Sequence, residues 1–89
     1  MIYEWDYDKA EINISLHGVS FEAIEEFGWE TSLITLDDRF DYGETRYVAI
    51  GVIGKRLHVV VFADRNSVTR IISLRKANKK EQKIHAQKT

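Results

Sequence analysis

Three runs rich in β-branched residues follow one another in the second half of the chain, and only short turns separate them. The runs cover residues 46–53, 57–63 and 68–74. Gly54 stands in the first turn, which favours a tight antiparallel hairpin, and residues 64–67 form a second turn. The sequence therefore predicts an antiparallel meander as the centre of the fold.

Side chains alternate between the two faces of a β-strand. Along the last run, strict alternation predicts a first face that carries Val68, Arg70, Ile72 and Leu74. The second, more polar face would carry Thr69, Ile71, Ser73 and Arg75.

Capping residues predict two helices before the meander. Asp6 or Asp8 is a suitable N-cap for a helix that stops at Gly18. Ser20 is a suitable N-cap for a second helix that ends at Gly28.

The remaining segments complete an α+β layout. Residues 2–5 and 31–36 fit strands, and residues 37–43 fit an exposed loop. Asn78, with Glu81 three residues later, marks the start of a closing helix. The predicted fold is a small antiparallel sheet flanked by two N-terminal helices and a C-terminal helix.

Length and composition exclude several classes of protein. A chain of 89 residues supports one core, so we expect a single domain over residues 1–89. The absence of cysteine removes disulfides, thiolate nucleophiles and cysteine-based zinc sites, and the three widely spaced histidines predict no metal and no other cofactor. No long apolar run or signal peptide is visible, so we expect a cytoplasmic protein without a membrane partner.

Charge is divided unevenly between the two halves of the chain. Residues 1–47 contain 12 Asp/Glu and 3 Lys/Arg, a net charge of −9, and residues 48–89 contain 2 and 10, a net charge of +8. The sum is the formal net charge of −1. Either the basic half attracts a polyanion, or the two halves neutralise each other in the folded chain.

Three arginines of the basic half could bind phosphate. Arg65 lies in a predicted hairpin turn, Arg75 ends the last predicted strand, and Arg70 lies between them. A guanidinium group matches phosphate geometry and stays charged. For each arginine alone, ordinary solubilising surface is the favoured interpretation, so the prediction depends on the cluster, and Arg70 could simply pair with an acid such as Asp64.

Several other residues allow more than one interpretation. Trp5 could stack on an unpaired base or pack in the core. His17, just before Gly18, could be a general base or a helix-capping group, and capping is favoured. His58 alternates onto the face of Val60 and is predicted to be structural. The lysine-rich tail could bind a phosphate backbone or keep the terminus soluble.

Several ordered segments resemble the BrnT family of bacterial ribonuclease toxins from BrnT/BrnA toxin–antitoxin systems. The most specific segments are Trp5-Asp6 with Lys9 and Asn13, the block at 17–21, then Glu44, Arg46 and Tyr47, and finally residues 70–77. Many relatives carry a basic residue just before the block, where this chain has Leu16.

The resemblance implies a RelE-like toxin fold and an endoribonuclease that arrests growth without a metal. It implies RNA as the substrate and a BrnA-like ribbon-helix-helix antitoxin as the partner, with DNA bound only through that antitoxin. Within it, Arg65 and Arg75 are the candidates for charge stabilisation, and His17 or Lys9 for proton transfer. Trp5, Arg46, Arg70 and Lys76 are the candidates for RNA binding. A non-catalytic module that binds nucleic acid or an antitoxin and acts in repression is the alternative.

Overall fold

The computed structural model describes residues 1–88 and has the expected α+β character. A short strand β1 (Ile2–Glu4) and a helix α1 (Tyr7–His17) are followed by two 3₁₀ helices, η1 (Phe21–Glu26) and η2 (Trp29–Thr31). Four strands come next, β2 (Leu33–Asp37), β3 (Arg46–Ile53), β4 (Arg56–Arg65) and β5 (Val68–Lys76), and the helix α2 (Lys79–Lys88) follows them.

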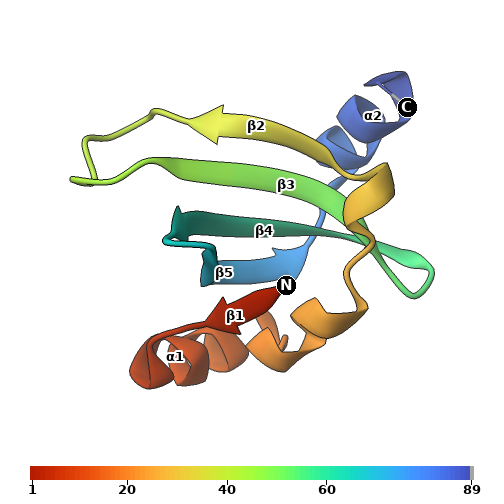
Figure 1. Ribbon diagram of the computed structural model, residues 1–89. Coiled ribbons are helices and arrows are strands. Elements are labelled where there is room, and N and C mark those ends of the chain that lie inside the picture. Colours follow the sequence, from red (N-terminus) through yellow and green to blue (C-terminus); the bar gives the residue numbers. More distant parts are fainter. Residues whose placement is uncertain (89) are drawn as a thin grey trace.

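The five strands form one mixed sheet in the order β1-β5-β4-β3-β2 (Figure 1). Strands β2 to β5 are antiparallel to their neighbours, which confirms the predicted meander. The prediction of a purely antiparallel sheet was wrong at one edge, where β1 runs parallel to β5 with Ile2 opposite Val68. This pairing joins strands more than sixty residues apart, so no turn between them marks it in the sequence.

The first predicted helix is confirmed, and the second is a 3₁₀ helix. Asp6 caps α1 through the backbone N–H of Lys9, and Gly18 ends the helix in the left-handed conformation. Ser20 caps η1 as predicted, but the bond from the Ala23 N–H to the Ser20 carbonyl oxygen spans only three residues. A 3₁₀ helix has three residues per turn, so it aligns the three buried residues of this segment, which are Phe21, Ile24 and Phe27.

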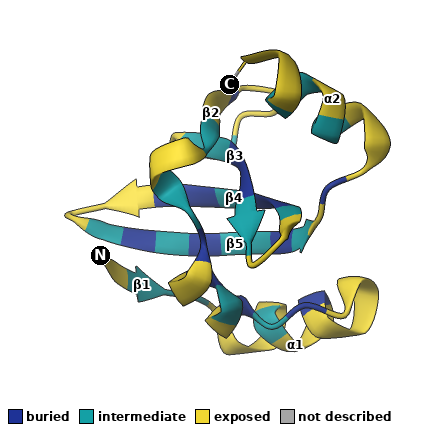
Figure 2. Ribbon diagram, turned by 90° about the vertical axis from the view of Figure 1, so that its right-hand side faces the viewer, coloured by how far each residue is buried: buried dark blue, intermediate teal, exposed yellow. Residues whose placement is uncertain are grey.

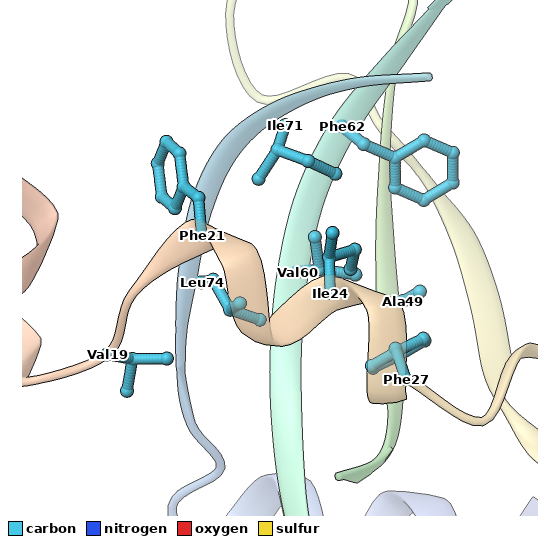
Figure 3. Close-up of a cluster of buried hydrophobic side chains, with 9 residues drawn as sticks. All are labelled: Val19, Phe21, Ile24, Phe27, Ala49, Val60, Phe62, Ile71 and Leu74. Carbon is cyan, nitrogen blue, oxygen red and sulfur yellow. The ribbon is translucent and has the colours of Figure 1, made fainter. Parts of the chain in front are cut away.

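The main hydrophobic core lies between η1 and one face of the sheet (Figure 3). We call this the core face. Its buried residues on the strands are Ala49, Val60, Phe62, Ile71 and Leu74, and η1 with its flanking residues contributes Val19, Phe21, Ile24 and Phe27. His58 lies on the same face and is buried, as predicted.

The helix α2 packs on the opposite face of the sheet, which we call the α2 face. Ile84 is its large apolar contact with a smaller cluster around Ile50 and Val59. Both α1 and α2 are largely exposed, whereas β4 contains much of the buried surface (Figure 2). Asn78 and Glu81 form the predicted cap: the Glu81 N–H donates to Asn78 Oδ1 at 2.8 Å, and the Asn78 N–H donates to Glu81 Oε1 at 2.9 Å.

Within residues 1–88, neither α-helix is long and apolar enough to cross a membrane. The same part of the chain contains no group of three acidic or histidine side chains arranged to hold a metal ion.

Candidate nucleic-acid interface

A β-bulge in β5 decides which arginines share a face. Val61 pairs with Ser73 and Phe62 pairs with Ile71, so Ile72 is an extra residue without its own partner. The bulge reverses the alternation, and Arg70 and Arg75 therefore lie on the same face. The predicted face assignment was wrong, because Leu74 joins Ile71 and Thr69 on the core face.

The strand register brings the other predicted arginines to the α2 face as well. Arg75 lies opposite Val59, and Arg70 lies opposite Ala63. Val59, Ala63 and Arg65 occupy alternate positions of β4, so Arg65 lies on the same face. Arg46 lies on this face too, because it is two positions from Val48 on β3. We call the set the arginine face: Arg39, Arg46, Arg65, Arg70 and Arg75.

A groove of about 290 Å³ lies on this face beside α2. Its floor is formed by Val48, Val59 and Val61, and Arg39 and Arg75 line it together. The two guanidinium groups are close enough for Arg39 to oppose the charge of Arg75. The groove is therefore a shallow apolar floor between cationic side chains.

Arg75 is held by α2 at one end of the groove. Its two terminal nitrogens donate to the two carboxylate oxygens of Glu81 at 2.8 and 2.7 Å. This bidentate pair lowers the pKa of the Glu81 carboxyl and raises that of the Arg75 guanidinium. Glu81 thus caps α2 and also fixes the direction of a groove arginine.

Glu44 joins two further arginines. Arg65 donates from Nε and from a terminal nitrogen to Glu44 Oε1 at 2.8 and 2.5 Å, and Arg46 Nε lies 3.4 Å from the other carboxylate oxygen. The hydrogen bond from Arg65 is the main reason that the pKa of the Glu44 carboxyl is lowered. Arg46 and Arg65 are therefore held side by side by one carboxylate.

Tyr42 connects this pair to the groove. The Arg46 guanidinium carbon lies 4.0 Å from the centre of the Tyr42 ring, a cation–π contact. The Tyr42 hydroxyl donates to Asp37 Oδ2 at 3.2 Å, and Arg39 Nε donates to Asp37 Oδ1 at 2.8 Å. The hydrogen bond from Arg39 lowers the pKa of the buried Asp37 carboxyl.

Arg70 completes the face at the β1 edge, where a terminal nitrogen lies 3.6 Å from a Glu4 carboxylate oxygen. The predicted alternative partner, Asp64, does not pair with it. Five arginines on this face are therefore matched by four carboxylates, those of Glu4, Asp37, Glu44 and Glu81. Glu4 and Glu44 come from the acidic half of the sequence, so folding partly neutralises the two halves against each other.

The other four predicted site residues lie away from the arginine face. Trp5 packs edge-on against Phe21, with ring centres 5.9 Å apart, and belongs to the main core. Lys9 and His17 lie at the two ends of α1, and both are exposed. Lys76 lies opposite the core-face residue His58. Four of the eight predicted residues therefore lie together on the arginine face, and the other four are spread over α1, the main core and the end of β5.

Sequence reasoning missed Arg39, Asp37 and Tyr42, because all three lie in or beside the segment predicted to be an exposed loop. The only signal in the sequence was the spacing Asp37-x-Arg39, which puts opposite charges two positions apart at the end of a strand. The sequence analysis named Glu44 only as part of a segment that resembles the family. Its contact with two arginines could not be predicted, because it depends on how β3 and β4 pair.

The arginine face can bind a phosphate diester but contains no poised pair of proton carriers. Its guanidinium groups are oriented in advance, which lowers the entropic cost of binding an anion. Three of its carboxylates, those of Asp37, Glu44 and Glu81, accept hydrogen bonds from arginines that lower their pKa, which makes them weak bases. Any chemistry on this face must depend on positioning and charge stabilisation.

Residues 5–81 match the family described as the ribonuclease toxin BrnT of type II toxin–antitoxin systems. The matched range includes every residue of the arginine face and the carboxylates of Asp37, Glu44 and Glu81. A search of curated proteins finds no match.

Proposed function

Because the chain belongs to the BrnT family of ribonuclease toxins of type II toxin–antitoxin systems, we propose that it is a metal-independent endoribonuclease that binds RNA on its arginine face. The observation that carries this proposal is the groove that Arg39 and Arg75 line together, on the face that also carries the paired Arg46 and Arg65. Several guanidinium groups on one face suit successive phosphates of a single strand.

Metal-free cleavage of RNA needs three events. The 2′-hydroxyl loses its proton and attacks the adjacent phosphorus, the extra negative charge of the phosphorane is stabilised, and the 5′-oxygen leaves with a proton. The products are a 2′,3′-cyclic phosphate and a 5′-hydroxyl end. Arg75 and Arg39, which line the same groove, stabilise the phosphorane, and Arg46 and Arg65 hold the backbone of a neighbouring nucleotide. Arg65 lies about 20 Å along β4 from Val59, the strand partner of Arg75, so it contacts a different phosphate.

Ion pairs within the free protein prepare these arginines for phosphate. Glu81 and Glu44 hold Arg75 and Arg65 in fixed directions before RNA arrives. A phosphate that approaches the groove accepts hydrogen bonds from the guanidinium groups in place of the carboxylates. Because Lys9 and His17 lie on α1, proton transfer in this mechanism falls to water and to the substrate itself.

The proposal extends to the partner and the cellular site. Type II systems pair a toxin with a protein antitoxin, and we propose that a ribbon-helix-helix antitoxin neutralises this chain in the cytoplasm. DNA would then be contacted through the antitoxin. We also propose that the sheet and its helices are related to those of RelE-type toxins.

One observation favours a second candidate, a non-catalytic module that binds RNA or the antitoxin and acts in repression. Within residues 1–88, all five arginines of the face are ion-paired, and hydrogen bonds from arginines lower the pKa of three of the partner carboxyls, those of Asp37, Glu44 and Glu81. Such a module would bind RNA with a strong salt dependence and would leave it intact.

The deciding experiment incubates the purified chain with an end-labelled single-stranded RNA in the presence of a chelator. Cleavage with 2′,3′-cyclic phosphate ends is the expected result. Binding without cleavage, in the same chelator buffer and with folded protein, would establish the non-catalytic module instead. Cleavage that appears only after a divalent metal is added would refute the metal-independent mechanism.

A further inference from the structure

A second pocket lies on the core face, beyond the area that η1 covers. Its volume is about 320 Å³, and it is lined by Met1, Trp29, Ile34, Tyr47, Phe62 and Asp64. None of these residues belongs to the arginine face. The volume of the pocket lies at the small end of the range for ligand pockets, about 300–1,000 Å³, and is sufficient for a single long side chain.

Aromatic rings form the walls of this pocket. The centres of Trp29 and Phe62 lie 5.1 Å apart with their rings nearly perpendicular, and Tyr47 stacks on Phe62 at 5.5 Å. Trp29 is fixed by a hydrogen bond from its indole N–H to the Tyr3 hydroxyl at 2.7 Å. The rings therefore keep their positions before anything binds.

Asp64 is the one acidic group that lines the pocket. Its carboxylate accepts a long hydrogen bond from the Thr69 hydroxyl at 3.5 Å, and within residues 1–88 it forms no ion pair. The four carboxylates of the arginine face all have guanidinium partners, so Asp64 differs from them. An aromatic pocket with one unpaired carboxylate attracts a cation.

Apolar surface continues around the pocket. Met1, Ile34 and Leu36 are 77%, 48% and 58% exposed. Because Ile34 and Leu36 alternate on β2 opposite Ala49 and Tyr47, both lie on the core face. A pocket for one anchor side chain, surrounded by exposed apolar residues, resembles the apolar centre of a protein interface.

We propose that this pocket binds an arginine side chain of a protein partner, which lies against the aromatic rings and pairs with Asp64 while its apolar neighbours cover Ile34 and Leu36. A guanidinium group suits the pocket because it stacks on aromatic rings and bonds a carboxylate with two hydrogens. Charge favours a basic partner, since Asp64 is the one charged side chain among the residues that line the pocket. The proposal does not depend on ribonuclease activity.

The test is an NMR titration of the ¹⁵N-labelled chain with the peptide acetyl-Thr-Val-Arg-Val-Thr-amide. The expected result is saturable shifts of the Trp29 indole N–H and of the backbone amides of Ile34 and Tyr47. The same peptide with neutral citrulline in place of arginine should bind at least about fivefold more weakly, because it keeps the shape and loses the charge.

Two variants distinguish binding at Asp64 in the pocket from nonspecific attraction to acidic residues elsewhere. Asp64→Asn should weaken the arginine peptide about tenfold and make the arginine and citrulline peptides equivalent. Asp38→Asn removes the same charge from an exposed position outside the pocket, so binding should stay at the parent level.

Three outcomes would overturn the proposal. Equal binding of the arginine and citrulline peptides would show that the positive charge does not contribute to binding. Shifts confined to residues of the arginine face would place the peptide elsewhere. Shifts of the Trp29 indole with an oligouridine, strengthened by Asp64→Asn, would identify a nucleotide pocket instead.

Discussion

Asn13 pairs its side-chain amide with both backbone groups of Leu74, as a neighbouring strand would do. Its Nδ2 donates to the Leu74 carbonyl oxygen at 2.7 Å, and the Leu74 N–H donates to Asn13 Oδ1 at 3.2 Å. The same Nδ2 also donates to the Val19 carbonyl oxygen at 2.9 Å. Since β1 ends at Glu4, opposite Arg70, the Asn13 amide serves the edge of β5 where β1 no longer covers it.

Replacing Asn13 with alanine should destabilise the protein by about 2–4 kcal/mol, because buried backbone groups of Leu74 and Val19 would lose their partners. Asn13 is the only residue of α1 that is fully buried, so few other contacts can compensate. Urea unfolding of the variant measures the loss. Ser15→Ala, at an exposed position of the same helix, is the control and should change stability by no more than about 0.5 kcal/mol. Equal stability of the two variants would show that Asn13 is not an anchor.

Gly51 on β3 lies directly against the ring of Phe27. A Cβ atom at this position would stand 2.5 Å from Phe27 Cζ, which is closer than side chains approach. Gly51→Ala should therefore cost about 1–3 kcal/mol of stability. The double variant with Phe27→Leu should lose less than the sum of the two single losses, because the smaller side chain leaves room. Strict additivity in thermal unfolding would exclude this clash.

Local signals in the sequence were sufficient for most elements. Asp6 and Gly18 bound α1, Gly54 marks the β3–β4 hairpin, and Asn78 with Glu81 starts α2. In each case the residue acts on backbone groups within a few positions, so the sequence pattern alone identifies it. The second turn lies within the predicted residues 64–67 but is shorter: Asn66 and Ser67, both at positive φ, form it, and Asp64 and Arg65 belong to β4.

The non-local features could not be predicted in this way. The parallel pairing of β1 with β5 depends on residues more than sixty positions apart. The bulge at Ile72 leaves no mark in a run of β-branched residues, yet it decides that Arg70 and Arg75 share a face. Arg65, Arg70 and Arg75 were selected for their charge, and whether they take part in catalysis stays a prediction.

Acid should weaken the attachment of α2. The hydrogen bonds from Arg75 hold the pKa of the Glu81 carboxyl below its usual range in the folded protein. A lowered folded-state pKa contributes stability that is present at neutral pH and is lost as the pH falls through that pKa, so the loss should occur below roughly pH 4. NMR titration of the Glu81 carboxyl should give a higher pKa in Arg75→Gln than in the parent. An unchanged pKa would mean that the pair does not form in solution.

Expression of the chain alone should slow bacterial growth, because the family consists of ribonuclease toxins. Co-expression of the cognate antitoxin should restore growth. The measurement is a growth curve with the soluble protein quantified in parallel. Normal growth at a high level of soluble, folded protein would contradict the assignment of toxicity to this chain.

Cleavage of RNA should depend on the arginine face and not on α1. Arg75→Ala should lower the cleavage rate by on the order of a hundredfold or more, the loss typical of a removed charge contact in a transition state. Arg65→Ala should lower it by about tenfold or more, because a contact that positions the RNA backbone is lost. Both ion pairs are at least partly exposed, so stability should change by no more than about 1 kcal/mol. Arg56→Ala removes a guanidinium group at the β3–β4 hairpin and should cleave at the parent rate.

The same assay compares the predicted residues on α1 with those of the arginine face. Lys9→Ala and His17→Ala should retain most of the activity if cleavage occurs on the arginine face, because both residues lie on α1. A loss of activity in these two variants, with Arg65→Ala and Arg75→Ala unaffected, would move the active site to the side of the molecule that carries α1. The proposed positions of the phosphate contacts would then be wrong, although the ribonuclease assignment would stand.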